Sequence, residues 1–191
     1  TLEERQVPVL RASAGRKIDL GGGATLTLLG PPSPFINSGR SDVNANSVVT
    51  RLTYGAATAV LSGDAEPETE QWLLAQKIDL AAGVLKVGHH GSKYASGAAF
   101  LRAVQPRLSM ISVGTHNDYG HPTPEALARL AASGSQVLRT DLLGDITVRS
   151  RDGQPFQLEG PPSASAPTAA PAQNPAATPA APTQAAPPPP A

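Results

Sequence analysis

The sequence contains no cysteine among its 191 residues, which excludes disulfide bonds and thiolate metal sites. It also has no net charge, because 15 Lys and Arg balance 15 Asp and Glu. Bulk charge therefore does not indicate a nucleic-acid binder, although a local basic patch is compatible with this balance. No apolar run approaches the roughly 20 residues of a membrane-spanning helix. What is left is enough chain for one folded domain with a mixed surface.

The two ends of the chain are unlike its middle. The first residue is Thr1 rather than Met, and no signal-peptide pattern follows it, so we expect the back part of a longer protein or a processed product. Residues 159–191 are rich in Ala and Pro, with no charged and no large apolar side chain after residue 159. Such a segment cannot bury enough surface to offset its ordering entropy. We expect residues 1–158 to fold and residues 159–191 to be a disordered tail; a polyproline ligand is the alternative.

Hydrophobic runs and turn residues predict hairpins first and alternating strands and helices afterwards. Glycines separate the strands of each hairpin, at residues 21–23 and at Gly55. Pro67 and Pro124, each with a nearby Glu, favour helix starts. The expected strands are 17–20, 24–29, 47–54, 58–62, 84–87, 108–113, 136–139 and 144–149, and the expected helices are 67–76, 97–104 and 123–132. This order predicts a layered α/β or α+β sandwich.

Metal-type side chains follow three of the expected strands. Asp64 ends an apolar run, His89 and His90 end the next one, and His121 lies a few residues past the third. Loops at strand ends are where rigid scaffolds present chemistry. Asp and His are ligands of hard and borderline divalent cations. The pattern predicts a metal-dependent hydrolase site.

Some of these residues have simpler interpretations. Asp64 would also suit the cap of the helix that follows it. His121 would also suit an exposed surface loop. His116 has no comparable neighbours, and we expect it to be an exposed loop residue.

The paired histidines are harder to explain by structure alone. Two adjacent histidines after an apolar strand have no packing reason to be there. The flanking Gly88 and Gly91 would let the backbone approach an ion or a phosphate closely. We therefore interpret His89 and His90 as functional.

Other polar residues near these motifs have two interpretations each. Ser92 and Lys93 would hydrogen-bond a phosphate, or would belong to a solvated loop. Asn44 and Asn46 precede a strand and are most simply turn formers, and their amides would also reach a substrate.

Taken together, the motifs resemble a known family, the metallo-β-lactamase-fold domain at the C-terminus of ComEC-type DNA-internalisation (competence) proteins. The resemblance covers about residues 5 to 149, with the motifs in order. They are Asn44-Ala-Asn-Ser-Val-Val-Thr-Arg-Leu-Thr-Tyr-Gly55, Leu61-Ser-Gly-Asp-Ala-Glu66, Leu85-Lys-Val-Gly-His-His-Gly-Ser92, Ile111-Ser-Val-Gly114 and Tyr119-Gly-His-Pro-Thr-Pro-Glu125.

The resemblance implies the second half of a four-layer αββα sandwich with one or two divalent ions, Mn or Zn, at the sheet edges. It implies a nuclease that degrades single-stranded DNA on the extracytoplasmic side of the cell membrane, beside a membrane channel domain. By the same resemblance Asp64 matches a bridging metal ligand, and one of His89 and His90 matches the last metal histidine. The site candidates are His121 and His90 for catalysis, Asn46, Ser92 and Lys93 for substrate binding, and Asp64, His89 and His90 for metal.

One part of the family pattern is missing. The His-x-His-x-Asp-His cluster of the fold's first half, or its His-x-Asp-x-Asp-His variant, does not occur in this sequence. A catalytic zinc-type site needs about three protein ligands per metal. We therefore expect a fragment, a split gene or a partner chain that provides the N-terminal half of the domain. Without that half, we expect an uncovered face on the strands around Val48, Leu52, Val60, Leu85 and Ile111.

Two other functions are compatible with the sequence. The first is a metallo-hydrolase acting on a small ester or lactam, since one fold hosts many chemistries. The second is a non-catalytic half-domain, for which the missing cluster is the evidence. A roomy basic groove beside His89 and His121 would favour DNA, and a closed apolar pocket would favour a small substrate.

Overall fold

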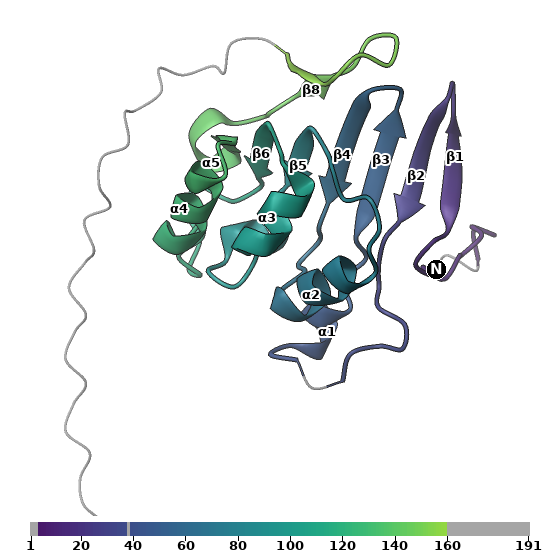
Figure 1. The fold of residues 1–191 in the computed structure, drawn as a ribbon, viewed down its shortest axis with the longest axis horizontal. Helices are drawn as coiled ribbons and strands as arrows, with labels where there is room; N and C mark the ends of the chain where they lie inside the picture. Colours follow the sequence, from purple (N-terminus) through teal and green to yellow (C-terminus); the bar gives the residue numbers. More distant parts are fainter. Residues whose placement is uncertain (1–3, 38, 160–191) are drawn as a thin grey trace, which may run out of the picture.

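The structure, a computed structural model, describes residues 4–37 and 39–159, and its main feature is a seven-stranded mixed sheet whose strands follow chain order (Figure 1). The strands are β1 (Lys17–Gly21), β2 (Ala24–Leu28), β3 (Thr50–Tyr54), β4 (Ala57–Leu61), β5 (Val84–Lys86), β6 (Leu108–Ile111) and β7 (Gln136–Arg139). The tail expected to be disordered lies, from residue 160 on, outside the described residues, so that expectation stays a prediction.

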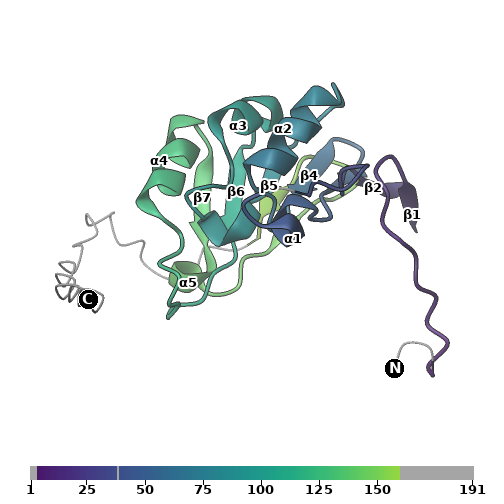
Figure 2. The same ribbon diagram turned by 90° about the horizontal axis from the view of Figure 1, so that it is seen from below.

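The sheet has an antiparallel half and a parallel half. Strands β1 to β4 form an antiparallel meander, with the predicted glycine turns between β1 and β2 and between β3 and β4, and β4 to β7 are parallel. The parallel strands are connected by α2 (Pro67–Ala75), α3 (Ala98–Val104) and α4 (Pro124–Ala132). Right-handed crossovers between strands added in one direction place every helix on the same face. Figure 2 shows these three helices together on one side of the sheet.

The helix face of the sheet carries the main core. Val60, Leu85 and Ile111 point toward the helices and are fully buried. From the helices, Leu73, Phe100, Leu101 and Leu130 are at most 2% exposed and join the same cluster. Pro67 and Pro124 stand in the first turns of α2 and α4, as predicted, and the Thr123 side chain accepts a hydrogen bond from the Ala126 N–H.

The opposite face, called the open face below, is also apolar. Register places one row of six aliphatic side chains across β1 to β6, because directly paired residues share a face: Ile18, Leu26, Leu52, Ala59, Val84 and Leu108. Its central members Ala59, Val84 and Leu108 are buried. Toward the edges and the strand ends the cover is missing, since Ile18 is 37% and Leu61 41% exposed.

The C-terminal segment supplies the cover that exists. It contains α5 (Thr140–Leu143) and a two-stranded sheet of β8 (Val148–Arg149) and β9 (Gln157–Leu158). Leu143, Ile146, Val148, Phe156 and Leu158 pack against the open-face cluster. The segment is held at its turn, where the Gly153 carbonyl accepts a hydrogen bond from the Ala56 N–H at 2.6 Å.

The expected uncovered face was therefore partly wrong. Val60, Leu85 and Ile111 belong to the helix face and are fully buried. The sequence does not tell which face of a doubly apolar strand a residue takes, because strands buried on both faces lack alternation. Leu52 does lie on the open face, where it is partly buried, and Val48 is 47% exposed before β3.

The mixed α/β (α+β) class is confirmed, with one helix layer over one sheet, as half of a four-layer sandwich requires. Local differences occur where short elements replace expected loops and strands. A one-turn helix, α1 (Asp42–Ala45), lies between the expected strands 24–29 and 47–54 and is capped by the Ser41 side chain. The expected strand 144–149 shortens to β8, and α5 and β9 were not predicted.

Candidate metal centre at the strand ends

The metal-type residues gather at the edge where the parallel strands end. Asp64 follows β4, His89 and His90 follow β5, and His121 lies in the connection from β6 to α4. Adjacent parallel strands bring their carboxyl ends to one edge, which is the usual position of a site in open α/β sheets. The ring centroid of His89 is 6.5 Å from that of His90 and 5.6 Å from that of His121. The predicted histidine set is thus one cluster in space.

The paired histidines stand in a left-handed turn. His89 (φ 43°, ψ 46°) and His90 (φ 53°, ψ 25°) are followed by Gly91 at φ 81°. For residues with a side chain, this conformation costs roughly 1–2 kcal/mol each. Strain of this kind persists only where the surroundings impose it, and it concentrates at functional sites. The turn thus supports the functional interpretation of both histidines.

The flanking glycines are required by packing. A Cβ on Gly91 would stand 2.6 Å from the Pro122 Cβ, and one on Gly88 would stand 3.0 Å from the Ala65 carbonyl oxygen. From the sequence, we expected these glycines to let the backbone approach an ion or a phosphate. In the structure they let the turn pack against its neighbouring loops, and the Gly91 carbonyl accepts a hydrogen bond from the Thr123 N–H.

His90 is oriented as a metal ligand would be. Its Nδ1 lies 2.6 Å from the Ser112 carbonyl oxygen, which can only accept, so Nδ1 carries the proton. The other ring nitrogen, Nε2, is left with its lone pair and lies 3.7 Å from Asp64 Oδ1. Fixing one ring nitrogen on a backbone carbonyl is the usual outer support of a metal-binding histidine.

Asp64 does not cap the following helix. The residue at the N-cap of α2 is Glu66, so the capping alternative for Asp64 is wrong. The Asp64 backbone N–H donates to Ser47 Oγ, while its carboxylate is about half exposed and faces His90. Because it is about half exposed, the Asp64 carboxylate is accessible to a cation. Its charge also acts on the Lys86 amine, where it opposes the lowering of the pKa by burial.

His89 is held by a carboxylate that sequence analysis did not select. Its Nδ1 lies 2.9 Å from Glu66 Oε1, and Glu66 is only 4% exposed. Asn44 Nδ2 approaches the same ring nitrogen at 3.5 Å. A buried acid at the N-terminal end of a helix is also stabilised by the helix dipole. In the sequence, Glu66 could have been identified by its position two residues after Asp64.

His121 is half-buried, like His89, whereas His90 is exposed. Burial, then the neighbouring His89 and His90, lower the pKa of His121 below its ordinary value. Its Nδ1 is buried without a hydrogen-bond partner in the part of the chain that the structure describes. The backbone around it is fixed by Asn117, whose side chain accepts from the His121 N–H and donates to the His121 carbonyl, both at 2.9 Å. The lowered pKa favours the neutral ring, and the Asn117 side chain fixes the backbone that carries it.

The candidate substrate-binding residues divide into two groups. The Asn46 amide is occupied by backbone, since it accepts from the Ile36 N–H and donates to the Ile36 and Asp42 carbonyls. Asn44, not Asn46, contacts the histidine cluster. Ser92 is buried beside the site and Lys93 is exposed. His116 is exposed, as predicted.

An open pocket of about 290 Å³ lies beside His89 and His121. It is lined by Arg40, Ser41, Glu66, His89, Ser92, Tyr94, Tyr119 and His121. Arg40 lies 3.5 Å above the Tyr94 ring centroid, and the Lys93 amine lies 5.1 Å from the same centroid. The pocket is therefore open rather than closed, with the cationic side chain of Arg40 in its lining and that of Lys93 close by.

Comparison with known proteins gives three informative relatives. ComE operon protein 3 of Bacillus subtilis (strain 168) is 39% identical over 109 residues, which is 57% of this chain and 14% of that protein. Competence protein ComA of Neisseria gonorrhoeae is 39% identical over 104 residues, 54% of this chain and 15% of that protein. Recombination protein 2 of Haemophilus influenzae is 36% identical over 107 residues, 55% of this chain and 13% of that protein. No protein-family model matches the chain.

The resemblance to ComEC-type competence proteins is confirmed. The matches cover about half of this chain, and the chain spans only 13–15% of the length of these competence proteins. In the described part of this chain, no helix is long and apolar enough to cross a membrane.

As in the sequence, a complete set of metal ligands is lacking in the described part of the structure. Within residues 4–37 and 39–159, no group of three or more His, Asp or Glu side chains is placed to hold a metal ion. The types of donor fit Mn or Zn, and Asp64 and His90 stand within the span of two ligands of one ion, each bonded at about 2.0–2.2 Å. Their number does not suffice for a catalytic site. Among the described residues, Asp64 and His90 are therefore two candidate ligands for one ion.

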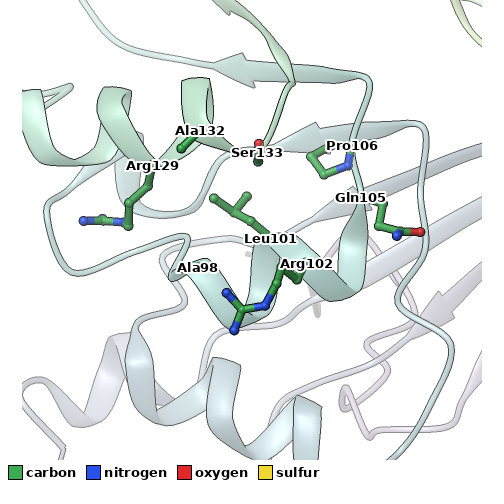
Figure 3. Close-up of a pocket in the computed structure, with 8 residues that line it drawn as sticks. All are labelled: Ala98, Leu101, Arg102, Gln105, Pro106, Arg129, Ala132 and Ser133. Atoms are coloured by element: carbon green, nitrogen blue, oxygen red, sulfur yellow. The ribbon is translucent and has the colours of Figure 1, made fainter.

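A second pocket of about 600 Å³ lies away from this edge, between the C-terminal ends of α3 and α4 (Figure 3). It is lined by Ala98, Leu101, Arg102, Gln105, Pro106, Arg129, Ala132 and Ser133. The guanidinium of Arg129 is occupied by the carbonyls of Lys93, Ala95 and Ser96. The described residues that line this pocket include no carboxylate and no histidine, and the one hydroxyl among them, on Ser133, donates to the Leu130 carbonyl, so nothing there marks a reaction site.

Proposed function

We propose that the chain is part of a metal-dependent DNA phosphodiesterase in a competence protein that takes up DNA. The observation that carries this proposal is the pairing of Asp64 with a histidine whose other ring nitrogen is fixed by a backbone carbonyl. The 39% identity to ComE operon protein 3 and to Competence protein ComA supports the role in DNA uptake. By the same likeness, we propose a membrane-associated domain on the extracytoplasmic side, beside a channel domain.

Each residue of the cluster has a place in this proposal. Asp64 and His90 would hold one ion, Mn or Zn, and the Nε2 of His89, which is not placed to complete that set, would serve a second ion. A bound divalent ion of this kind lowers the pKa of a water and offsets charge on a phosphoryl oxygen. Neutral His121 accepts a proton or donates from Nε2 to a phosphate oxygen beside the cluster.

The missing ligands would come from a second sheet that covers the open face. Leu61 is exposed at the end of β4, three residues before Asp64, so the uncovered apolar surface adjoins the incomplete metal site. A sheet packed there would bury that surface and reach the same edge. We call this chain, together with the segment or partner that supplies the second sheet, the completed domain.

Among the alternatives, a small-substrate metallo-hydrolase is less well supported than a phosphodiesterase. Its pocket should be enclosed and mostly apolar. The pocket beside His89 and His121 is open and has Arg40 at its rim, with Lys93 close by. A non-catalytic half-domain is supported by the incomplete ligand set, and the following experiment separates it from the enzyme.

The experiment compares Asp64→Ala and His90→Ala in the completed domain. Both changes should remove a metal ligand, so they should lower metal content and abolish Mn- or Zn-dependent cleavage of a labelled DNA strand. His116→Ala, an exposed histidine outside the cluster, is the matched control and should retain both. His121→Ala should lower turnover while leaving metal content intact. Unchanged cleavage in the Asp64 and His90 variants would exclude the metal role, and an inactive wild type would favour the non-catalytic half-domain.

A further inference from the structure

Tyr119 is an aromatic ring that no packing requirement explains. It is 84% exposed, although it lines the pocket beside the histidine cluster. Its ring lies at 24° to that of His121, with the centroids 6.1 Å apart. One face of Tyr119 is thus turned to the site, and the ring is open to solvent. A tyrosine that joins no core is free to stack on a planar ligand.

The position of Tyr119 is defined by the loop that carries it. The Asn117 side chain bonds both the N–H and the carbonyl of His121, which closes the residues between them into one turn. The same side chain donates to the Gly114 carbonyl at 3.3 Å. The backbone that carries Tyr119 is therefore fixed relative to His121, so less of the loop has to be ordered when a ligand binds.

The other wall of the pocket is cationic and also ordered. The Arg40 guanidinium rests on the Tyr94 ring at 3.5 Å, and this contact holds it in place. The Arg40 backbone N–H donates to Glu68 Oε1, which ties its loop to α2. Lys93 adds a second positive charge near Tyr94. One wall thus suits a phosphate and the other suits a base.

We propose that the pocket between Tyr94 and Tyr119 is a subsite for one unpaired nucleotide, with its base stacked on Tyr119 and its phosphate held by Arg40 and Lys93. The proposal rests on the proposed function only in taking DNA as the ligand. A base within a duplex has both faces covered by its neighbours, so a stacking residue reads single strands. Tyr119 would thereby select a single strand next to the reacting phosphate, without reading its sequence.

Binding of short DNA to residues 1–191 tests the subsite without any catalysis. The probes are a fluorescently labelled thymidine oligonucleotide and a blunt duplex of equal length, measured by anisotropy in EDTA. Tyr119→Ala should weaken single-strand binding about five-fold or more, the lower limit for loss of a stacking aromatic, and should leave duplex binding unchanged. Tyr119→Phe keeps the ring and should bind like the wild type.

Matched controls separate stacking from folding and from charge. Tyr54→Ala removes a tyrosine at the end of β3, which runs antiparallel to β4 and ends at the opposite edge of the sheet, and it should leave both affinities unchanged. Arg40→Ala and Lys93→Ala should weaken single-strand and duplex binding alike and reduce their salt dependence, whereas Lys77→Ala, an exposed lysine elsewhere, should not.

The outcomes distinguish this proposal from the proposed function. Equal single-strand binding by wild type and Tyr119→Ala, or no binding by the wild type, would overturn the nucleotide subsite even if the completed domain cleaves DNA. Selective loss of single-strand binding would support it even if the completed domain lacks cleavage.

Discussion

The two faces of the sheet differ in how completely they are covered. On the helix face, Val60, Leu85 and Ile111 are fully buried beneath α2, α3 and α4. On the open face, an equally apolar row is covered only in the middle, by residues 143–158. A parallel sheet that is apolar on both faces needs two covers. The difference indicates that stability resides on the helix face and that the open face is where a further layer packs.

Phe100 offers the largest test of this difference. It is 1% exposed at the centre of the helix-face core, so Phe100→Ala should cost about 3–5 kcal/mol in the free energy of unfolding. Leu61, 41% exposed on the open face, is the matched position, and Leu61→Ala should change stability by no more than about 0.5 kcal/mol. Urea unfolding of residues 1–191 measures both.

The contrast sharpens further in the completed domain. There Leu61 would be buried, and Leu61→Ala should cost about 2 kcal/mol or more. Similar small costs in both forms would mean that nothing packs on this part of the open face.

Glu70 provides an intermediate effect, which depends on pH. Burial raises its pKa to about 7, although hydrogen bonds from the Gly97 and Ser96 N–H groups and the charge of Arg129 oppose this and Glu66 adds to it. The folded protein then binds a proton more tightly than the unfolded chain, so stability is greatest below about pH 4.5 and falls as pH rises toward about 7. We expect a loss of order 1–3 kcal/mol across this window.

Glu70→Gln is the control for that titration. It removes the ionisable group but keeps the shape, so the difference in unfolding free energy between variant and wild type should change from pH 4.5 to pH 8 in favour of the variant. A constant difference across this range would show that folding does not raise the pKa of Glu70.

Much of the fold followed from the sequence because the pattern was strong. Apolar runs, Pro67 and Pro124, and the glycine turns predicted the hairpins and helices. The assignment of residues to faces did not follow, since it depends on the register of paired strands, which puts Val60 and Leu85 on the helix face. Short elements such as α1, α5 and β9 depend on tertiary contacts that local pattern does not contain.

The site could be predicted as residue types at strand ends, and less well as contacts. The clustering of His89, His90 and His121 followed from strands ending at one edge. The partnership of Glu66 with His89 did not, because it requires the left-handed turn that two non-glycine residues adopt.

The smallest expected effect concerns the C-terminal tail. Residues 160–191 lie outside the described part of the chain, and their composition offers no side chain for a core. Deleting them should leave the thermal unfolding midpoint nearly unchanged, as measured by calorimetry. A fall of several degrees would mean that the tail packs on the domain. The tail would then be a further segment that covers a face of the sheet.

Metal content tests the central claim most directly, that this chain carries only part of a metal centre. Residues 1–191 and the completed domain are dialysed after loading with Mn or Zn, and bound metal is measured by mass spectrometry. The account predicts well under one ion per chain for residues 1–191, and one or two ions for the completed domain that Asp64→Ala releases. One tightly held ion per chain in residues 1–191 alone would contradict it.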